Sequence, residues 1–438
     1  MPLAFQPNES HPMVDALLRT RVPRWEELNR AIDARDDMLD FALKLSGYDR
    51  DLALTSYFQN ALEQLQLVRH IAGWRGPIGR MLDFASGYGR LTRLLVHEGV
   101  AKEVTVSDIL EGGMEFQAEQ FGVKTLLSTT RPEDFAARET YDLIFVVSLF
   151  THLPAATFTR WLRRLAELLT PEGLLIFTVH DESLAPEPFE GGIRFDSSSE
   201  SRVLEGSDYG STWVTESYVR EQVASVAPGA ACVRMPRALA EWQDVYVVSP
   251  APLPEAVPRA IPKGFIEEFV VTDEGVRLTG WATLVTGPVD RIEVRVEDEL
   301  VASVGHFGPR EDVAAMLDSP EALLSSWWLI VPHERIRSFR YQVVTVSAFS
   351  REGAERILFL GTVEARDGQK LRELTESLQH QLEIRTRDVA VLQHEVAVAL
   401  HQRGERDAQM AAMRASRFWR VRDWWFGVKR ALGLTRQP

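Results

Sequence analysis

The sequence predicts an α/β fold with a mostly parallel sheet, followed by a small β-sandwich and a helical coiled coil. Three observations carry this prediction. Short aliphatic runs alternate with helical segments between residues 80 and 250. A proline-rich stretch then separates them from a β-rich region, and the residues after 366 are charged and helical in pattern. A chain of 438 residues has the length of about two to three domains.

The composition limits the class of protein. Hydrophobic residues make up 45% and charged residues 26%, as in soluble globular proteins. The net charge of -14 disfavours a polyanionic partner, so we expect no nucleic acid. The single cysteine, Cys232, cannot form an internal disulfide or a multi-cysteine metal site, so we expect a reducing compartment and no metal. Without a signal peptide or an apolar run of about 20 residues, the expected location is the cytoplasm.

The first 250 residues divide into two predicted regions. Residues 1–75 are expected to be a helical cap, because MVDALLRTRVPRWEELNRAID and SYFQNALEQLQLVRHIAGW place apolar residues three and four apart. Residues 76–250 are expected to form the α/β domain. Its predicted strands are MLDFA, EVTVSDI, VKTLLS, DLIFVVS, GLLIFTV and VYVVS.

The linker and the β module follow. Residues 251–264 are expected to be a linker, because the stretch SPAPLPEAVPRAIPKG is too rich in proline for a helix or a central strand. Residues 265–365 are expected to form the β-sandwich. Alternation of polar and aliphatic residues in RIEVRV, and the strong strand pattern of YQVVTVSAF, predict sheets with one exposed and one buried face.

The C-terminal residues carry two further predictions. Residues 366–413 are expected to form a coiled coil and hence a homo-oligomer, because Leu371, Leu378 and Leu392 share one heptad position. Arginines interrupt this seam, so a single solvated helix is the alternative. Residues 414–438 combine a basic charge with an apolar helical face, which is typical of an anchor on an anionic membrane surface. The alternative is a helix packed on a partner subunit or on the globular domains.

The residues from Met81 to Arg90 indicate a ligand site. A strand here runs into a glycine turn and then a helix, which brings backbone N–H groups close to a ligand. Asp108 ends the next strand, where an acid can accept hydrogen bonds from ribose hydroxyls. Gly89 is followed by Arg-Leu-Thr, so the turn does not match the pyrophosphate-binding GxGxxG pattern, which disfavours a dinucleotide.

The turn resembles the signature of class I, Rossmann-like methyltransferases that use S-adenosyl-L-methionine. The resemblance continues through YDLIFVVSLFTHLP at 141–154 and LLTPEGLLIFTVH at 168–180. It implies that the glycines flank the methionine moiety, that Asp108 holds the ribose and that Ile109 packs on the adenine. The chain departs from the family at Ala85, where the first glycine usually stands. The cofactor-binding residues that the resemblance implies are Asp83, Ala85, Ser86, Gly87, Gly89, Asp108, Ile109, Thr130 and Ser148.

Two histidines are the candidate catalytic residues. His152 and His180 follow the fourth and fifth strands, at the edge where open α/β sheets bind ligands, and either could take a proton from a hydroxyl. A backbone-satisfied structural role is the alternative for each. The segment 190–223 is expected to be a loop that covers the site. The candidate substrate contacts are Tyr57, Tyr209, Trp213 and Tyr218, with simple packing as the alternative for each.

The substrate class is predicted from the appended regions. LTGWA at 278–282 and GPREDVA at 308–314 resemble a small β-sandwich attached to enzymes of bacterial surface-polysaccharide clusters, and the C-terminal sequence resembles that of glycan-modifying enzymes. The prediction is O-methylation of a sugar hydroxyl in a surface glycan or its lipid-linked precursor, at the inner face of the cytoplasmic membrane. The alternatives are a methyltransferase for another small molecule or a protein, and a non-catalytic scaffold.

Overall fold

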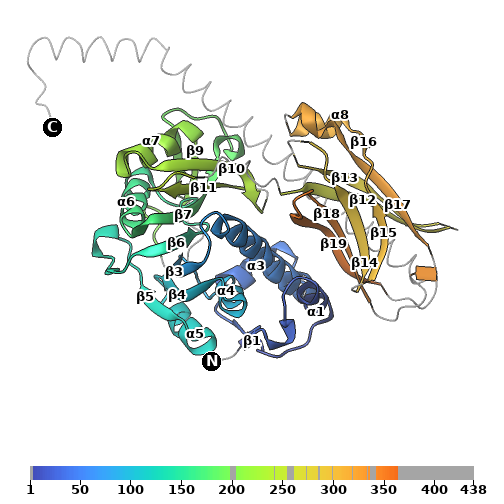
Figure 1. Cartoon of the computed structure of the whole chain (residues 1–438), viewed down its shortest axis with the longest axis horizontal. Helices are drawn as coiled ribbons and strands as arrows, with labels where there is room; N and C mark the ends of the chain where they lie inside the picture. Colours follow the sequence, from blue (N-terminus) through green and yellow to red (C-terminus); the bar gives the residue numbers. More distant parts are fainter. Residues whose placement is uncertain are drawn as a thin grey trace, which may run out of the picture. The chain divides into compact units, whose positions relative to one another are not determined.

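The computed structural model describes residues 3–197, 204–240, 242–253 and 261–363, apart from short gaps at 273, 285–286, 298, 318, 333 and 336–341. The described residues belong to one compact unit, Met1–Arg366 (Figure 1). The predicted coiled coil, the predicted tail and the middle of the predicted linker lie outside the described residues. Within the described residues, no helix is both long and apolar enough to cross a membrane.

The α/β domain contains the sheet that the sequence predicts. Its strand order is β10-β11-β7-β6-β3-β4-β5, and the five strands from β7 to β5 run parallel. The hairpin of β10 and β11 adds antiparallel to β7. The strand bounds are Ile78–Phe84 for β3, Ala101–Asp108 for β4, Lys124–Leu127 for β5, Tyr141–Val146 for β6, Leu169–Asp181 for β7, Ala231–Leu239 for β10 and Gln243–Ser249 for β11. Each of the six predicted runs forms one of these strands, so the Rossmann-like fold is confirmed.

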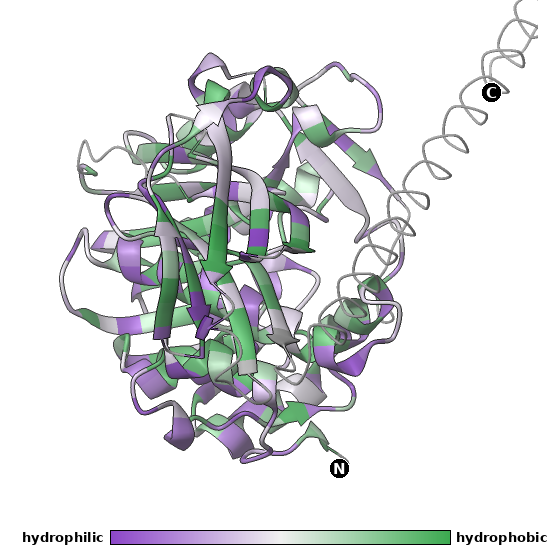
Figure 2. Cartoon of the chain, turned by 90° about the vertical axis from the view of Figure 1, so that its right-hand side faces the viewer, coloured by the Kyte–Doolittle hydropathy of each residue, from purple (hydrophilic) through white to green (hydrophobic). Residues whose placement is uncertain are grey.

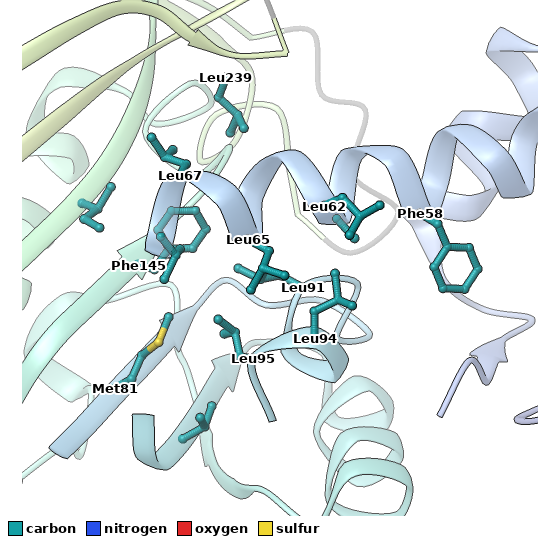
Figure 3. Packing of buried hydrophobic residues seen from close by; sticks show 14 of the residues in the cluster. Phe58, Leu62, Leu65, Leu67, Met81, Leu91, Leu94, Leu95, Phe145 and Leu239 are labelled. Carbon is teal, nitrogen blue, oxygen red and sulfur yellow. The ribbon is translucent and has the colours of Figure 1, made fainter. Parts of the chain in front are cut away.

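Buried side chains form a separate hydrophobic cluster on each face of the sheet. Met81 lies in one cluster and Leu82 in the other, because successive strand residues point to opposite faces. On the first face, the long helix α3 (Arg50–Ala72) packs Leu62 and Leu65 beside Leu94 of α4 (Figure 3). The other flanking helices are α4 (Thr92–Glu98), α5 (Glu111–Phe121), α6 (Ala155–Ala166) and α7 (Glu216–Val226).

The N-terminal region is less helical than its sequence pattern predicts. Helix α1 (Pro12–Arg19) is followed by a single 3-10 turn, η1 (Trp25–Glu27), and by β2 (Ile32–Asp33), which pairs with β1 (Leu3–Phe5). Pro23 stops the helix, because proline has no N–H to donate. The Trp25 ring then packs under the guanidinium groups of Arg19 and Arg30, at 5.4 and 5.7 Å. The second predicted helix forms in full as α3.

The β module consists of two four-stranded sheets with the orders β12-β13-β17-β16 and β15-β14-β18-β19. The bounds are Lys263–Val271 for β12, Gly275–Thr283 for β13, Arg291–Val296 for β14, Glu299–Val304 for β15, Gly308–Pro309 for β16, Leu324–Pro332 for β17, Gln342–Phe349 for β18 and Glu355–Val363 for β19. A short helix, α8 (Glu311–Met316), follows β16.

Exposed and buried residues alternate regularly along β17, as the sequence pattern predicts for the module. Figure 2 shows hydrophilic and hydrophobic segments mixed along the strands of the chain. Strand β14 departs from this expectation, because Glu293 is buried. Its carboxylate accepts hydrogen bonds from Arg291 at 2.7 Å and Arg295 at 2.9 Å. These paired charges offset the cost of burying the carboxylate within a strand.

Candidate active site

A cavity of about 620 Å³ lies at the end of β3, the strand at which the strand order of the sheet changes direction. Strand β3 pairs with β4 on one side and β6 on the other, so the loops after these strands diverge to opposite faces. The structure brings most of the predicted cofactor residues to this cavity. Those that line it are Asp83, Ala85, Ser86, Gly87, Asp108, Ile109, Thr130 and Ser148.

The two glycines of the turn have different structural roles. Both adopt positive φ angles, 56° for Gly87 and 76° for Gly89. A Cβ on Gly87 would meet no atom within 4 Å, so its backbone faces open space beside the cavity. A Cβ on Gly89 would lie 2.8 Å from the side chains of Gln117 and Phe121. Gly87 therefore leaves room for a ligand, whereas Gly89 allows close packing of α5 and does not line the cavity.

Ala85 retains the glycine-like conformation of the position it occupies. Its φ angle is 60°, in the left-handed region that favours glycine. The turn is held by the Ser86 N–H, which donates to the Ser107 carbonyl over 3.1 Å. The side chain of Gln117 also donates to Ser86 Oγ over 2.9 Å. The departure from the family pattern therefore leaves the turn in place and stores strain in its backbone.

Asp108 connects the glycine turn to the end of β4. Its Oδ2 accepts the Gly87 N–H over 2.8 Å, and its Oδ1 accepts the Leu110 N–H over 3.0 Å. Burial raises the pKa of this carboxyl, although the backbone hydrogen bonds act in the opposite direction. A carboxylate has about four acceptor positions, and backbone N–H groups of Gly87, Ile109 and Leu110 use up to three of them, so at least one remains for a ribose hydroxyl.

Asp83 is a buried acid in the wall of the same cavity. Burial raises the pKa of Asp83 to about 7, and the charge of Asp108 acts in the same direction. Thr92 Oγ1 donates to its Oδ2 over 2.8 Å. An incoming cation would favour the ionised carboxylate. The open Gly87 backbone, Asp108 and this acid together fit a cofactor that carries a ribose and an ammonium group.

Helix α2 (Asp37–Leu45) contributes a wall of the cavity that the sequence reasoning missed. Asp36 caps the helix by accepting the Met38 N–H over 2.9 Å. Met38 and Phe41 line the cavity, and both are partly exposed, at 38% and 46%. An aspartate directly before an apolar run is a signal of a helix start. That signal predicts the helix but not the surface against which it packs.

Tyr57, a predicted substrate contact, does not line the cavity. Its side chain is buried in α3, and its hydroxyl donates to Asp36 Oδ2 over 2.6 Å. Arg93 of α4 donates to the same hydroxyl over 3.0 Å. Tyr57 therefore positions the start of α2 relative to α4, the helix that follows the glycine turn. Its side chain is buried, so a substrate in the cavity cannot contact it.

His152 and Tyr209 meet in the cavity wall. Their rings are stacked, with centroids 4.4 Å apart and planes inclined by 18°. Nδ1 of His152 lies 2.6 Å from the Gly210 carbonyl oxygen, so it must carry the proton. The neutral ring then has its acceptor lone pair on Nε2. His152 is thereby held in the tautomer that a general base requires.

His180 lies next to His152 but does not line the cavity. The two ring centroids are 6.4 Å apart. Burial lowers the pKa of His180 to about 4, and the proximity of His152 contributes in the same direction. Its Nδ1 is buried, and no described residue forms a hydrogen bond with it. His180 is therefore neutral at physiological pH and less well placed than His152 to reach an acceptor.

The segment expected to be a covering loop contains regular structure. Strand β8 (Ile193–Asp196) pairs with β9 (Ser211–Val214), and α7 follows. Trp213 lies 6.4 Å from the His180 ring, and Tyr218 packs edge-on against Phe158 at 5.7 Å. Neither of these predicted substrate contacts lines the cavity, because the β9 pairing and the α7 packing direct them elsewhere. Leu204, Asp208 and Tyr209 do line it.

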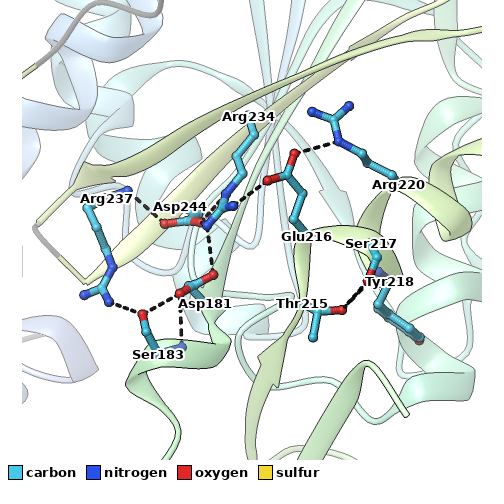
Figure 4. A network of polar contacts seen from close by, with 10 residues as sticks. All are labelled: Asp181, Ser183, Thr215, Glu216, Ser217, Tyr218, Arg220, Arg234, Arg237 and Asp244. Atoms are coloured by element: carbon cyan, nitrogen blue, oxygen red, sulfur yellow. Dashed lines mark hydrogen bonds and ion pairs between the residues drawn. The ribbon is translucent and has the colours of Figure 1, made fainter. Parts of the chain in front are cut away.

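A polar network stabilises the sheet edge beyond His180 (Figure 4). Arg234 of β10 forms ion pairs with Asp181 at 2.8 Å, Glu216 at 2.5 Å and Asp244 at 2.6 Å. Asp181 directly follows His180 in the chain, and its carboxylate pairs with Arg234. The network joins the closing hairpin to α7. On the cavity side, Gln243 donates to Ser148 Oγ over 2.8 Å.

Comparison with known proteins gives a family match for part of the chain. Residues 82–175 match a family model described as a methyltransferase domain. No curated protein matches the chain.

Three solved structures illustrate the similarity. DhpI in complex with SAH is 19% identical, covering 49% of this chain and 96% of that chain with a TM-score of 0.32. An S-adenosylmethionine-dependent methyltransferase from Clostridium acetobutylicum ATCC 824 is 13% identical, covering 50% and 99% with a TM-score of 0.34. The N-methyltransferase NodS from Bradyrhizobium japonicum WM9 is 16% identical, covering 44% and 85% with a TM-score of 0.29. The family match and the strand order together show that the chain carries a Rossmann-like domain similar to methyltransferases, with the glycine turn at its cavity.

Proposed function

We propose that this chain is an O-methyltransferase that methylates a sugar hydroxyl of a bacterial surface glycan or its lipid-linked precursor. The observation that carries the proposal is the position of His152. It lines the same cavity as Gly87 and Asp108, and its Nδ1–H is held by the Gly210 carbonyl. When its ring is neutral, a histidine oriented in this way can take a hydroxyl proton, which an oxygen acceptor must lose.

Some residues of the cavity would bind the cofactor, and others would bind the acceptor and take its proton. Bound S-adenosylmethionine supplies an electrophilic methyl group on sulfur. Asp83 would face the ammonium group and Asp108 the ribose hydroxyls, and the acceptor would bind beside His152 and Tyr209, which line the same cavity. His152 Nε2 would accept the hydroxyl proton as the new oxygen–carbon bond forms and the sulfur–carbon bond breaks. Orientation of the two reactants in one cavity supplies much of the remaining rate.

The choice of a glycan acceptor has two supports. The acceptor end of the cavity combines an aromatic ring, Tyr209, with polar side chains such as Asp208 and Thr157. Aromatic and polar groups in one pocket suit a ligand with both C–H faces and hydroxyls. The second support is the resemblance of the β module and the C-terminal sequence to those of surface-glycan enzymes. Membrane association through residues 414–438 and oligomerisation through residues 366–413 belong to the same proposal.

Substitution of His152 tests the proposed chemistry. In the His152→Asn variant, we expect kcat for methyl transfer to fall by about 10²- to 10⁴-fold, the usual contribution of a general base. We expect the Kd for S-adenosylmethionine, measured by calorimetry, to stay within about threefold, because binding groups remain. Transfer of a labelled methyl group is measured to nucleotide-linked hexoses, polyprenyl-linked saccharides and extracted surface glycan.

His180→Asn is the matched control, because His180 is adjacent but does not line the cavity. If His152→Asn retains full kcat, the proposed base is wrong. If methyl transfer occurs to small molecules or proteins but to no saccharide, the acceptor class is wrong. Failure of the full chain to bind S-adenosylmethionine at millimolar concentration would leave only the scaffold alternative.

A further inference from the structure

The β module presents three aromatic side chains on one face of the sheet formed by β12, β13 and β17. Phe265 lies directly opposite Trp281 in the β12–β13 pair. Trp328 lies opposite Thr279, which is two residues before Trp281 and therefore on the same face. Phe265 is 47% exposed and Trp328 is 65% exposed. The register thus places Trp281, which is partly buried, as the immediate neighbour of Phe265 and the diagonal neighbour of Trp328.

Polar groups accompany these rings on the same face. Arg277 forms a 3.5 Å ion pair with Glu268, and Thr279 Oγ1 donates to the same carboxylate over 3.4 Å. Arg277 and Thr279 alternate with the buried residues of β13, so they point in the same direction as Trp281. This face therefore combines flat apolar rings with hydrogen-bonding groups, and the charges of Arg277 and Glu268 neutralise each other.

We propose that this aromatic face, defined by Phe265, Trp281 and Trp328, binds saccharide. One face of a sugar ring presents C–H bonds that pack on an aromatic ring, while its equatorial hydroxyls extend sideways. Thr279, Glu268 and Arg277 supply donors and acceptors beside the rings. The aromatic side chains are rigid and lose little conformational entropy on binding, so a shallow exposed surface can hold a neutral ligand.

The size and charge of the aromatic face favour saccharide over other occupants. The exposed parts of Phe265 and Trp328 amount to roughly 250 Å², whereas a stable protein interface needs about 800 Å² from each partner. A patch of roughly 300–600 Å² on a monomer is often functional. A membrane or nucleic acid would require unpaired cations, but Arg277 is paired with Glu268. A saccharide of about two or three neutral sugar rings fits both the area and the charge of the aromatic face.

This site lies outside the methyltransferase domain and goes beyond the proposed reaction. A sugar chain held by the aromatic face would raise the local concentration of acceptor groups along one polymer. The biological meaning of this site rests on the proposed function, because the site would hold the same class of acceptor. Binding itself does not depend on methyl transfer, so the two can be tested separately.

The test uses the full chain with three probes: isomaltohexaose, mannohexaose and chitohexaose. We expect saturable binding of at least one hexasaccharide by calorimetry, with a change in tryptophan fluorescence. Trp328→Ala should weaken this binding about tenfold or more, and Phe265→Ala about threefold or more, in line with the loss of one stacking ring each. Trp242→Ala is the matched control, because Trp242 is 63% exposed but lies in the methyltransferase domain.

Three results would overturn the proposal: no hexasaccharide binds, the Trp328 and Phe265 variants bind like the wild type, or Trp242→Ala weakens binding equally. Self-association that is lost in Trp328→Ala, without saccharide binding, would assign the face to a second copy and also overturn it. Binding of S-adenosylmethionine by each variant checks the methyltransferase domain. Saccharide binding that persists in His152→Asn shows that failure of the reaction and failure of the aromatic face are separable.

Discussion

The backbone N–H of Gly87 donates to Asp108 Oδ2 over 2.8 Å, which joins the turn after β3 to the end of β4. One carboxylate therefore fixes the shape of the glycine turn and faces the cavity. An acid that only contacts a ligand would affect ligand binding alone, whereas Asp108 also holds the backbone of the turn. Changing Asp108 should disturb the turn even without cofactor.

We expect Asp108→Asn to raise the Kd for S-adenosylmethionine by about tenfold or more, because an amide cannot accept both backbone N–H bonds and a ribose hydroxyl. Calorimetry measures the Kd. Asp134→Asn is the control, because Asp134 lies on an exposed 3-10 turn. An unchanged Kd in Asp108→Asn would contradict the assignment of the ribose site.

Ala85→Gly should stabilise the protein. The φ of 60° costs alanine about 1–2 kcal/mol, which exceeds the loss of about 0.5–1 kcal/mol from the greater entropy of glycine. We expect the free energy of unfolding in urea to rise by roughly 0.5–1 kcal/mol. Ala118→Gly, at an exposed position within α5, should lower it by a similar amount. Destabilisation by Ala85→Gly would show that the methyl group has a packing role.

Cofactor binding should depend on pH through Asp83, whose pKa is about 7. A cationic cofactor favours the carboxylate, so affinity should rise up to about tenfold between pH 6 and pH 8. Asp83→Asn should bind with little pH dependence over this range. Calorimetry in buffers of different ionisation enthalpy would also detect proton release. Equal pH dependence in both proteins would contradict the role of Asp83.

The same group affects stability with a defined sign. Its folded pKa lies above the unfolded value of about 3.9, so burial penalises the ionised form. Its contribution to the free energy of unfolding is therefore complete below about pH 4 and is lost as the pH rises through about 7. The stability difference between Asp83→Asn and the wild type, from urea unfolding, should grow in favour of the variant over this range.

Tyr57→Phe should destabilise the protein by about 1–3 kcal/mol, because the buried Asp36 carboxyl loses its donor and Arg93 loses an acceptor. Urea unfolding measures the change. Tyr48→Phe is the control, since Tyr48 is 71% exposed, and should shift stability by less than about 0.5 kcal/mol. A substrate-binding role alone would leave stability unchanged and raise KM.

Deletion of residues 414–438 should abolish sedimentation with phosphatidylglycerol vesicles, because this segment carries the basic and apolar pattern of an interfacial anchor. Phosphatidylcholine vesicles are the control, and binding to them should be much weaker without anionic headgroups. If the truncated chain still sediments with anionic vesicles, the anchor prediction is wrong.

The sequence by itself determined the sheet and the position of the cofactor turn. Apolar runs such as DLIFVVS and VYVVS report burial on both faces, and burial is a local property of each strand. The spacing from Asp83 to Asp108 likewise follows from one strand–helix–strand unit. Only the tertiary structure decided which distant side chains reach the cavity. Tyr57 and Tyr209 are both tyrosines in segments that the sequence predicts to lie near the substrate. Tyr57 is buried against Asp36, whereas Tyr209 stacks on His152 in the cavity wall.

The packing of separate segments also decided the wall made by α2, the pairing of Asp181 with Arg234 and the burial of Glu293. Periodicity shows which face of a helix or strand is apolar. It does not show which segment, tens of residues away, packs on that face or supplies a partner for a charge. That choice depends on the whole set of contacts, so it could be found only in the folded chain.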